Sequence, residues 1–220
     1  MRGRDEILEM LTAIDNRLFY LGGEVTAYMI GGGNMAIRGL KGVTKDIDLV
    51  IPAEKSRNSF LEALSNPPIA GFPIAFKLVE TIFGETPVWI VEFPDGGRLD
   101  IFGERIGPLK FSKNMAIRAE NLENLTGKKF RAFEIKLISI EDLIITKLIT
   151  SLERERDVDD LRLLLPFANP ATVLEEIRWQ LKNGWFDEVS LNALKRRLTK
   201  IGGSAPPEII KKVLLILEEL

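Results

Sequence analysis

Two aspartates at alternate positions of an apolar run are the residues in this sequence that most directly suggest chemistry. They are Asp46 and Asp48 in "DIDLVI", residues 46 to 51. In an extended strand, residues i and i+2 face the same side, roughly 6.6 Å apart along the chain. Two such carboxylates repel each other, and a divalent cation would remove the repulsion. The simpler alternative is a solvated edge strand whose polar face happens to carry two acids.

A third aspartate, Asp100, lies between Leu99 and Ile101 in the β-like run "GGRLDIFG". A strand carboxylate close to an apolar core is costly unless it is paired or bound to a metal. Three carboxylates from two neighbouring strands suit a phosphoryl-transfer site with two Mg²⁺ ions, which lie roughly 3.5–4 Å apart. We therefore expect Asp46, Asp48 and Asp100 to be metal ligands on one face of a sheet.

Three consecutive glycines, Gly31, Gly32 and Gly33, come shortly before the aspartate pair and follow a β-rich run. Glycine lets backbone N–H groups approach an anion closely, because no side chain blocks the approach. The pattern therefore predicts a phosphate-binding turn, although a plain strand-to-helix turn has the same composition.

The glycines also allow a second interpretation. Gly31-x-Gly33-x-x-Ala36 formally matches the dinucleotide-binding fingerprint. That fingerprint requires an acid about 20 residues further on, at the end of the second strand. Asp46 and Asp48 come earlier and open their strand. We therefore rank this interpretation below a metal site.

Composition limits the chemistry that these residues can support. The chain of 220 residues has no cysteine and no histidine, which excludes disulfides, Cys/His zinc sites, histidine bases and cysteine nucleophiles. Carboxylates, lysines and backbone groups remain, and these suit hard cations such as Mg²⁺. The net charge of −2 gives no bulk nucleic-acid signature. No run approaches the roughly 18 apolar residues of a membrane helix and no signal peptide is recognisable, so we expect a cytoplasmic protein.

The elements that would position these residues follow from hydrophobic periodicity. Helices are predicted at residues 4 to 20, 34 to 40 and 53 to 66. Strands are predicted at residues 24 to 30, 46 to 51, 76 to 83, 88 to 93 and 98 to 102, with a further strand pair at 114 to 122 and 131 to 139. The pentapeptide "NMAIR" occurs at 34 to 38 and at 114 to 118, and we interpret the repeat as coincidence because the two copies are predicted in different structures. After residue 138 the periodicity is helical throughout, so the predicted class is α/β (α+β) followed by a helical domain.

The order of these motifs resembles the nucleotidyltransferase superfamily of the polymerase-β type. The resemblance depends on Gly31-Gly32, a short helix, the run "TKDIDL" that begins at Thr44, and the later strand residue Asp100. It implies a nucleotidyltransferase-type mixed sheet with flanking helices, with a catalytic domain at 1–137 and a helical domain at 138–220. It also implies that the glycine turn holds the triphosphate of an NTP. The three aspartates would bind two Mg²⁺ ions, and Asp100 would also activate an acceptor hydroxyl.

Within that superfamily, the chain is most similar to the small prokaryotic branch that includes the AbiEii-type toxins and related uncharacterised proteins. The runs "ISIEDLIITKLIT" and "RERDVDDLRLL" resemble its helix signature. In that signature Lys147 matches a lysine that reaches the nucleotide phosphates, and Asp157 and Asp160 match acids of the next helix. The nucleotide-binding residues that the resemblance implies are Gly31, Gly32, Gly33, Asn34, Thr44 and Lys147.

The expected function is Mg²⁺-dependent transfer of a nucleoside monophosphate from an NTP, such as ATP, to a hydroxyl of tRNA or another RNA, a protein or a small molecule. The branch also implies a toxin–antitoxin role with an antitoxin partner, and no membrane association is expected. The alternative is a non-catalytic nucleotide-binding or antitoxin-like partner protein that keeps the fold. Departures from the branch pattern at Gly33, Asn34 and Gly42 favour this alternative. The intact aspartate triad favours an enzyme.

Several other residues have a plain structural interpretation beside a functional one. Lys147 could be a solvated helix lysine, and the acidic and basic run around Arg154 and Arg156 could be a solvated face rather than a phosphate contact. The run "KRRLTK", residues 195 to 200, could complement the C-terminal end of a helix dipole or contact tRNA. The tryptophans, Trp89, Trp179 and Trp185, are expected in the core or at an interface.

Overall fold

The computed structural model describes residues 1–65, 74–81, 84–93, 96–151, 154–183, 188–202 and 208–218. It divides into two compact units. The first comprises Met1–Val79, Glu85–Ile106 and Phe111–Ile138, and the second comprises Glu80–Gly84, Gly107–Lys110 and Ser139–Leu220. Trp185 and the last two residues of the strand predicted at 76 to 83 lie outside the described residues.

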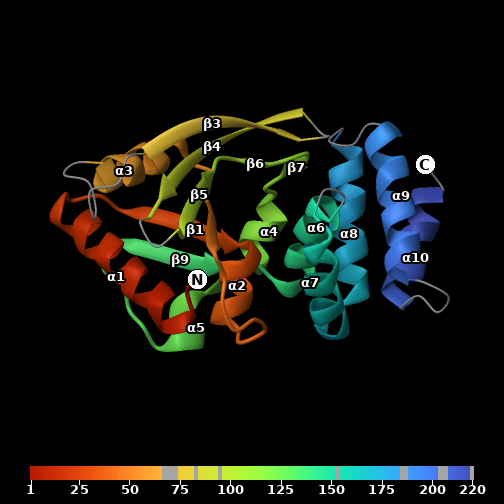
Figure 1. Cartoon of the computed structure of the whole chain (residues 1–220), viewed down its shortest axis with the longest axis horizontal. Coiled ribbons are helices and arrows are strands. Elements are labelled where there is room, and N and C mark those ends of the chain that lie inside the picture. Colours follow the sequence, from red (N-terminus) through yellow and green to blue (C-terminus); the bar gives the residue numbers. More distant parts are fainter. Residues whose placement is uncertain are drawn as a thin grey trace. The chain divides into compact units, whose positions relative to one another are not determined.

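Helices and strands are mixed along the chain up to residue 138, and in the described part of the chain β3 to β7 follow one another without a helix between them (Figure 1). The helices are α1 (Arg4–Tyr20), α2 (Gly31–Ile37), α3 (Glu54–Ser65), α4 (Lys113–Arg118) and α5 (Leu122–Thr126). The strands are β1 (Val25–Ile30), β2 (Asp46–Val50), β3 (Ile74–Thr81), β4 (Gly84–Glu92), β5 (Arg98–Phe102), β6 (Arg105–Ile106), β7 (Leu109–Lys110), β8 (Glu120–Asn121) and β9 (Phe133–Leu137).

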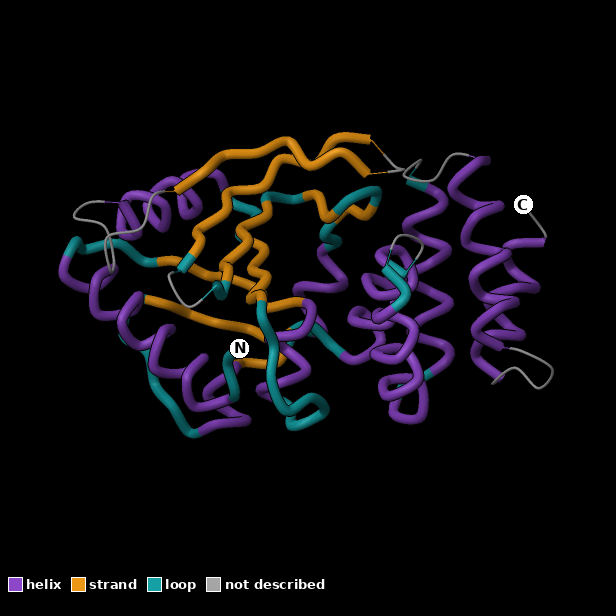
Figure 2. Tube along the Cα trace, viewed as in Figure 1, coloured by secondary structure: helices purple, strands orange, loops and turns teal. Residues whose placement is uncertain are grey.

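A mixed sheet in the order β3-β4-β5-β2-β1-β9-β8 forms the centre of this part of the chain (Figure 2). Strand β1 pairs with β2 antiparallel and with β9 parallel, whereas β2 pairs with β5 parallel. Because β2 lies between β1 and β5, the edge-strand interpretation of its aspartates is wrong. The dinucleotide-binding interpretation is also wrong, because that motif requires β1 and β2 to be parallel.

The apolar core lies on the sheet face that α1 and α3 cover. Alternate residues of each strand point into it, as period-two geometry requires. Strands β1 and β2, with the residue that follows β2, contribute Val25, Ala27, Met29, Ile47, Leu49 and Ile51, and each of these residues is at most 2% exposed. The intervening residues of β2, including both aspartates, therefore face the other side of the sheet.

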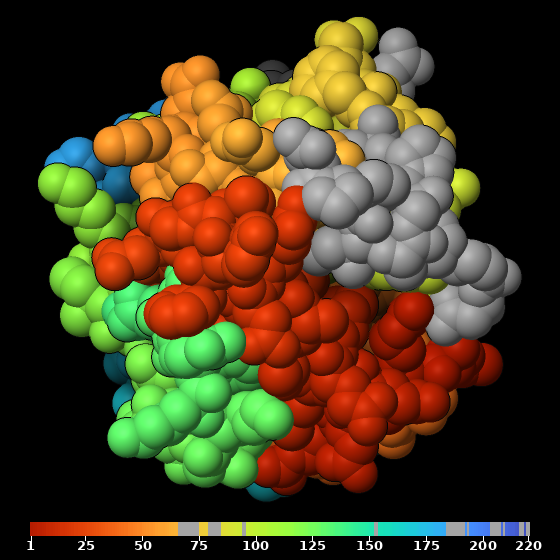
Figure 3. All heavy atoms as spheres, turned by 90° about the vertical axis from the view of Figure 1, so that its left-hand side faces the viewer, coloured from red at the N-terminus to blue at the C-terminus, as the bar shows by residue number. Residues whose placement is uncertain are grey.

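Asp15 of α1 fixes the start of β9. Its Oδ1 accepts backbone hydrogen bonds from Arg131 at 2.9 Å, Ala132 at 2.7 Å and Phe133 at 3.0 Å. The Arg131 guanidinium also covers the Phe19 ring, 4.0 Å from its centroid. Figure 3 shows the corresponding red helix and the green segment side by side on one face. A buried carboxylate with three N–H donors thus joins two segments far apart in the sequence.

Residues 114 to 122 do not form the strand that the sequence predicted. They form α4, the short strand β8 and the start of α5. Ser112 caps α4, since its side chain accepts a hydrogen bond from the Met115 N–H. Both copies of "NMAIR" are therefore helical, and the prediction that they differ in structure was wrong.

The remaining helices are α6 (Ile140–Thr150), α7 (Arg156–Leu164), a short 3₁₀ helix (Leu165–Phe167), α8 (Pro170–Lys182), α9 (Glu188–Gly202) and α10 (Glu208–Glu218). Ser139 caps α6 by accepting a hydrogen bond from the Asp142 N–H. A mixed sheet with flanking helices, followed by C-terminal helices, confirms the predicted α/β class. Among the described residues, no helix has the length and apolar character needed to cross a membrane.

Candidate active site

The parallel pairing of β2 with β5 brings the three aspartates onto one face of the sheet. Asp48 lies directly opposite Asp100, and Asp46 lies opposite Arg98. Residues in register on neighbouring strands project to the same side. The side chain of Asp100 is 7% exposed and that of Asp46 is 19% exposed, so water only partly screens their charges. The predicted grouping of these residues on one face is confirmed.

Arg98 lies within this carboxylate group, and the sequence interpretation did not include it. Its Nη2 is 2.6 Å from Asp100 Oδ2, and its Nε is 3.9 Å from Asp46 Oδ1. Arg98 precedes Asp100 by two residues and so shares its face of β5. That spacing is the signal in the sequence that could have identified it. The guanidinium supplies positive charge between two carboxylates that would otherwise repel each other.

The glycine turn lies against the same carboxylates. Gly31 has a φ of +62°, and a Cβ at this position would overlap Asp48 Oδ2. A Cβ on Gly32 would lie 2.5 Å from Thr44 Oγ1. Glycine is therefore required at both positions, for the left-handed backbone at Gly31 and for the close approach at each. The turn, Thr44 and Asp48 form one contiguous group of residues.

Asn34 has a structural role through its side chain. Its Nδ2 donates to Met29 O at 2.8 Å and to Ile138 O at 3.1 Å, and its Oδ1 accepts from Arg38 Nε at 2.9 Å. These bonds join α2 to the ends of β1 and β9. Any contribution of Asn34 to nucleotide binding would therefore come from its backbone. Gly33 packs over the core, where a Cβ would lie 3.3 Å from Met29 Sδ.

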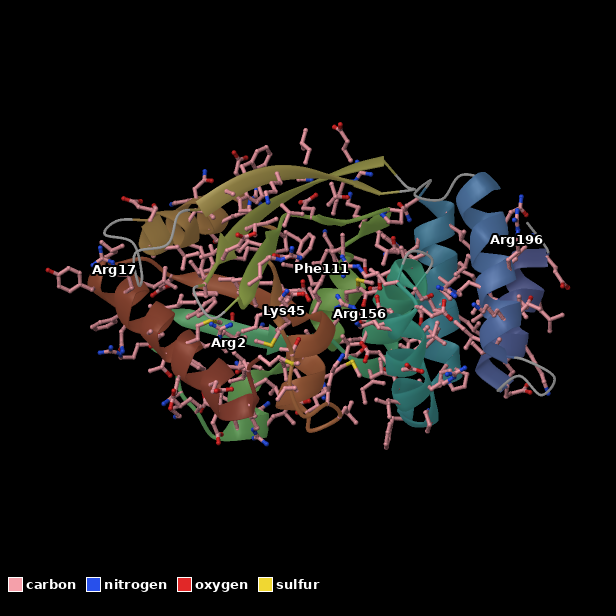
Figure 4. All side chains as sticks on the ribbon, viewed as in Figure 1. Arg2, Arg17, Lys45, Phe111, Arg156 and Arg196 are labelled. Carbon is pink, nitrogen blue, oxygen red and sulfur yellow. The ribbon has the colours of Figure 1, made fainter. Side chains whose placement is uncertain are left out.

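Thr44 is held in place from two sides. Its N–H and C=O pair with the backbone of Arg2 at 2.9 and 2.7 Å, and its Oγ1 donates to Asp46 O at 2.8 Å. Arg2 also lies over the Phe93 ring, 4.5 Å from its centroid. Figure 4 labels Arg2 and Lys45 in this part of the first unit. The chain segment before Asp46 is thus anchored, and basic side chains flank it.

The donor set suits a hard divalent cation, although it is not arranged as a closed cage. In the described ranges, no three acidic side chains converge in metal-binding geometry. Arg98 forms ion pairs with two of the three aspartates, through a 2.6 Å hydrogen bond to Asp100 Oδ2 and a 3.9 Å approach to Asp46 Oδ1. Carboxylate oxygens are the ligands that Mg²⁺ prefers, and the absence of a side chain at Gly31 lets the Asp48 carboxylate lie directly against the turn. The residues present therefore fit Mg²⁺ once Arg98 moves aside.

Lys147 lies in the second unit and is bound by two aspartates of that unit. Its Nζ is 2.7 Å from Asp157 Oδ1 and 2.7 Å from Asp160 Oδ2, and the residue is 9% exposed. Burial lowers the pKa of Lys147, but Asp157 and then Asp160 outweigh that effect and raise the pKa above its ordinary value of 10.5. The solvated-lysine interpretation is therefore wrong. A role toward nucleotide phosphates stays a prediction.

Two residues of the basic run at 195 to 200 form ion pairs with Glu155. Arg197 Nη1 is 2.7 Å from Glu155 Oε2, and Lys200 Nζ is 3.2 Å from Glu155 Oε1. The hydrogen bond from Arg197, followed by that from Lys200, lowers the Glu155 pKa. Arg196 is exposed on α9 (Figure 4). Any RNA contact by this run would therefore depend mainly on Arg196 and its neighbour Lys195.

Comparison with solved structures shows the fold. The crystal structure of ANT(2'')-Ia in complex with adenylyl-2''-tobramycin is similar with a TM-score of 0.52 at 13% identity, covering 80% of this chain and 97% of that chain. The solution structure of the antibiotic-resistance factor ANT(2'')-Ia gives a TM-score of 0.50 at 16% identity, covering 82% of this chain and 93% of that chain. The crystal structure of an antigenic nucleotidyltransferase-like protein from Paracoccidioides brasiliensis gives a TM-score of 0.47 at 21% identity, covering 88% of this chain and 94% of that chain. No family model and no curated protein matches the sequence.

The chain thus has a nucleotidyltransferase-like fold, with a central mixed sheet, flanking helices and C-terminal helices. The fold that the sequence resemblance implied is therefore confirmed, whereas membership of the polymerase-β-type superfamily stays a prediction. The closer resemblance to the AbiEii-type branch stays a prediction.

Proposed function

We propose that this protein transfers a nucleoside monophosphate from an NTP to an acceptor hydroxyl and releases pyrophosphate. One observation carries the proposal: Asp48 lies opposite Asp100 on neighbouring parallel strands and directly against the glycine turn at Gly31. Carboxylates for a cation and a glycine backbone that a phosphate can approach closely are thereby adjacent. The nucleotidyltransferase-like fold supports the same conclusion.

In the proposed reaction the acceptor oxygen forms a bond to the α-phosphorus as the bond to the β-phosphate oxygen breaks. Asp46, Asp48 and Asp100 would hold two Mg²⁺ ions, which when bound would neutralise the triphosphate and the leaving pyrophosphate. Asp100 would take the proton of the acceptor hydroxyl. The backbone N–H groups at Gly31 to Gly33 would lie beside the phosphates, with Thr44 next to them. Positioning and charge neutralisation would supply most of the catalysis.

A thermal-shift titration with each NTP, with and without Mg²⁺, tests the binding part of this proposal. At about 100 times its Kd, a ligand stabilises the folded state by about 2.7 kcal/mol. We expect a Mg²⁺-dependent shift with at least one NTP in the wild type, and its loss in the double variant Asp46→Asn/Asp48→Asn. The matched control is Asp5→Asn/Asp159→Asn, which changes the same net charge at exposed positions. Absence of any NTP shift in the wild type would refute the site.

Turnover tests the catalytic part. Asp100→Asn should abolish pyrophosphate release in the presence of the acceptor while leaving the melting curve cooperative. Unchanged turnover in this variant would contradict the assignment of Asp100. The acceptor would be tRNA, another RNA or a protein hydroxyl, and labelled-NTP transfer to each class would distinguish them. The proposal includes a role for this protein as the toxin of a toxin–antitoxin pair, with an antitoxin protein as its partner.

A second candidate is a non-catalytic partner protein that keeps the fold. The observation that favours it is that Arg98 and Lys147 both form ion pairs with aspartates. While they do so, neither side chain can bind the phosphates of a nucleotide. A second protein that co-purifies at fixed stoichiometry, together with no pyrophosphate release under any condition, would support this candidate over the enzyme.

A further inference from the structure

Arg98 makes its shortest contact with an oxygen that the proposed chemistry assigns to a metal ion. The contact from Nη2 to Asp100 Oδ2 is 2.6 Å, which is short for a hydrogen bond between charged groups. Only 7% of the Asp100 side chain is exposed, so water competes weakly for this oxygen. A guanidinium bound to this oxygen takes one of the lone pairs open to a metal, and its positive charge repels a Mg²⁺ ion on the same carboxylate.

The same guanidinium also reaches the second strand. Its Nε lies 3.9 Å from Asp46 Oδ1, across the parallel pairing of β2 with β5. Arg98 is 33% exposed, so its side chain has an open path to solvent, whereas the aspartates are held by their strands. The mobile member of the group is therefore the cation, and the fixed members are the carboxylates.

We propose that Arg98 is a built-in counter-cation that competes with the divalent metal for Asp46 and Asp100 and so sets the metal affinity of the site. This inference depends on the proposed function, because it assigns the same carboxylates to a metal. In the metal-free protein Arg98 keeps the aspartates from repelling each other. Metal binding releases Arg98 toward solvent, on the open side where the triphosphate would lie. Arg98 is thus a positioning residue that acts through Asp46 and Asp100.

This competition predicts a change in metal affinity whose sign is unusual for the removal of a side chain from a binding site. Removal of Arg98 should strengthen metal binding, because the metal no longer displaces a charged hydrogen bond. A residue that only orients Asp100 for the metal would give the opposite result when removed. A hydrogen bond to a charged group is worth enough to change an equilibrium by about tenfold, and partial exposure reduces the effect. We therefore expect the Mn²⁺ Kd to fall at least about fivefold.

The experiment is calorimetric titration of the full chain with Mn²⁺ alone, without nucleotide, for the wild type, Arg98→Gln and Arg98→Lys. Arg98→Gln should bind Mn²⁺ more tightly, and Arg98→Lys should restore affinity toward the wild type because it keeps the charge. The control is Arg162→Gln, which removes an exposed arginine paired with Asp159 in the second unit and should leave the Kd unchanged. Equal or weaker binding by Arg98→Gln would overturn the inference while leaving the proposed function intact. Absence of Mn²⁺ binding in every protein would overturn both.

A measurement on the wild type covers the case in which Arg98→Gln does not fold. The ¹⁵N–¹H signal of the Arg98 Nε, assigned by its absence in Arg98→Lys, should move to the position of a solvent-exposed guanidinium as Mg²⁺ is added. Saturation with Mg²⁺ without any change of this signal would show that Arg98 keeps its contacts, and would overturn the inference.

Discussion

Gly31 and Asp48 are in such close contact that any side chain at position 31 would displace the aspartate carboxylate. The two residues belong to different elements, the start of α2 and the middle of β2, and the antiparallel pairing of β1 with β2 brings them together. One glycine thus determines both the backbone of the turn and the position of a proposed metal ligand.

Gly31→Ala should therefore impair binding more than its effect on stability would suggest. The left-handed conformation costs a residue with a Cβ about 1–2 kcal/mol. In addition, the new methyl group must displace the Asp48 carboxylate. We expect the Mg²⁺-dependent NTP thermal shift to disappear while the melting curve stays cooperative.

Gly39→Ala is the matched control for this prediction. Gly39 also has a positive φ, of +73°, but a Cβ there meets no atom within 4 Å. The variant should lose a similar amount of stability and retain the NTP shift. If both variants lost the shift equally, the contact between Gly31 and Asp48 would not be the cause.

The sequence was sufficient to place the aspartates on a common face, because alternation in a strand is a local property. Asp46 and Asp48 point away from the core, and Ile47 and Leu49 point into it, as the pattern predicts. The partners of these aspartates depend on how β2 and β5 align. That register is set by distant pairing, so the sequence places Arg98 on the same face as Asp100 but does not show that it pairs with both Asp46 and Asp100.

The same distinction explains Lys147. From the sequence Lys147 could be a solvated helix lysine, whereas the structure shows that it is buried. Its partners, ten and thirteen residues further on, meet it only because α7 folds back against α6. The segment at 114 to 122 was mispredicted for another reason. Its apolar residues fit both the strand period of two and the helical period of about 3.6, and Ser112 favours the helix because it caps the first turn.

Asp15 should be one of the more important polar residues for the stability of the first unit. Asp15→Ala would leave three backbone N–H groups at the start of β9 without their acceptor. The loss should be about 3 kcal/mol in the free energy of unfolding, because each buried donor left unsatisfied is costly. Asp15→Asn keeps an acceptor oxygen and should lose about 1 kcal/mol. Urea unfolding of both variants tests this, and an equal loss in the two would contradict the hydrogen-bond explanation.

Lys147→Met should destabilise the helical unit strongly. The substitution leaves Asp157 and Asp160 buried without their shared cation, and breaking such a buried group costs about 3–5 kcal/mol. Adding Asp157→Asn should recover part of the loss, since one of the two orphaned charges is removed. Lys212→Met is the control, because Lys212 pairs with Glu208 at an exposed site and should cost less than about 0.5 kcal/mol. A similar loss at both lysines in urea unfolding would contradict this account.

The pH dependence of that contribution has a definite sign. The pKa of Lys147 is raised above 10.5 in the folded state, so the folded protein holds this proton more tightly than the unfolded chain. The stabilisation is therefore fully present below pH 10.5 and is lost as the pH rises through the folded-state pKa. Other lysines and tyrosines also titrate in this range, so the quantity to measure is the difference in unfolding free energy between wild type and Lys147→Met. That difference should stay constant from pH 7 to about pH 10 and shrink above 10.5, because the neutral amine no longer balances the two aspartates. A difference that instead shrank on acidification from pH 9 to 7 would mean that the stabilisation does not come from the Lys147 charge.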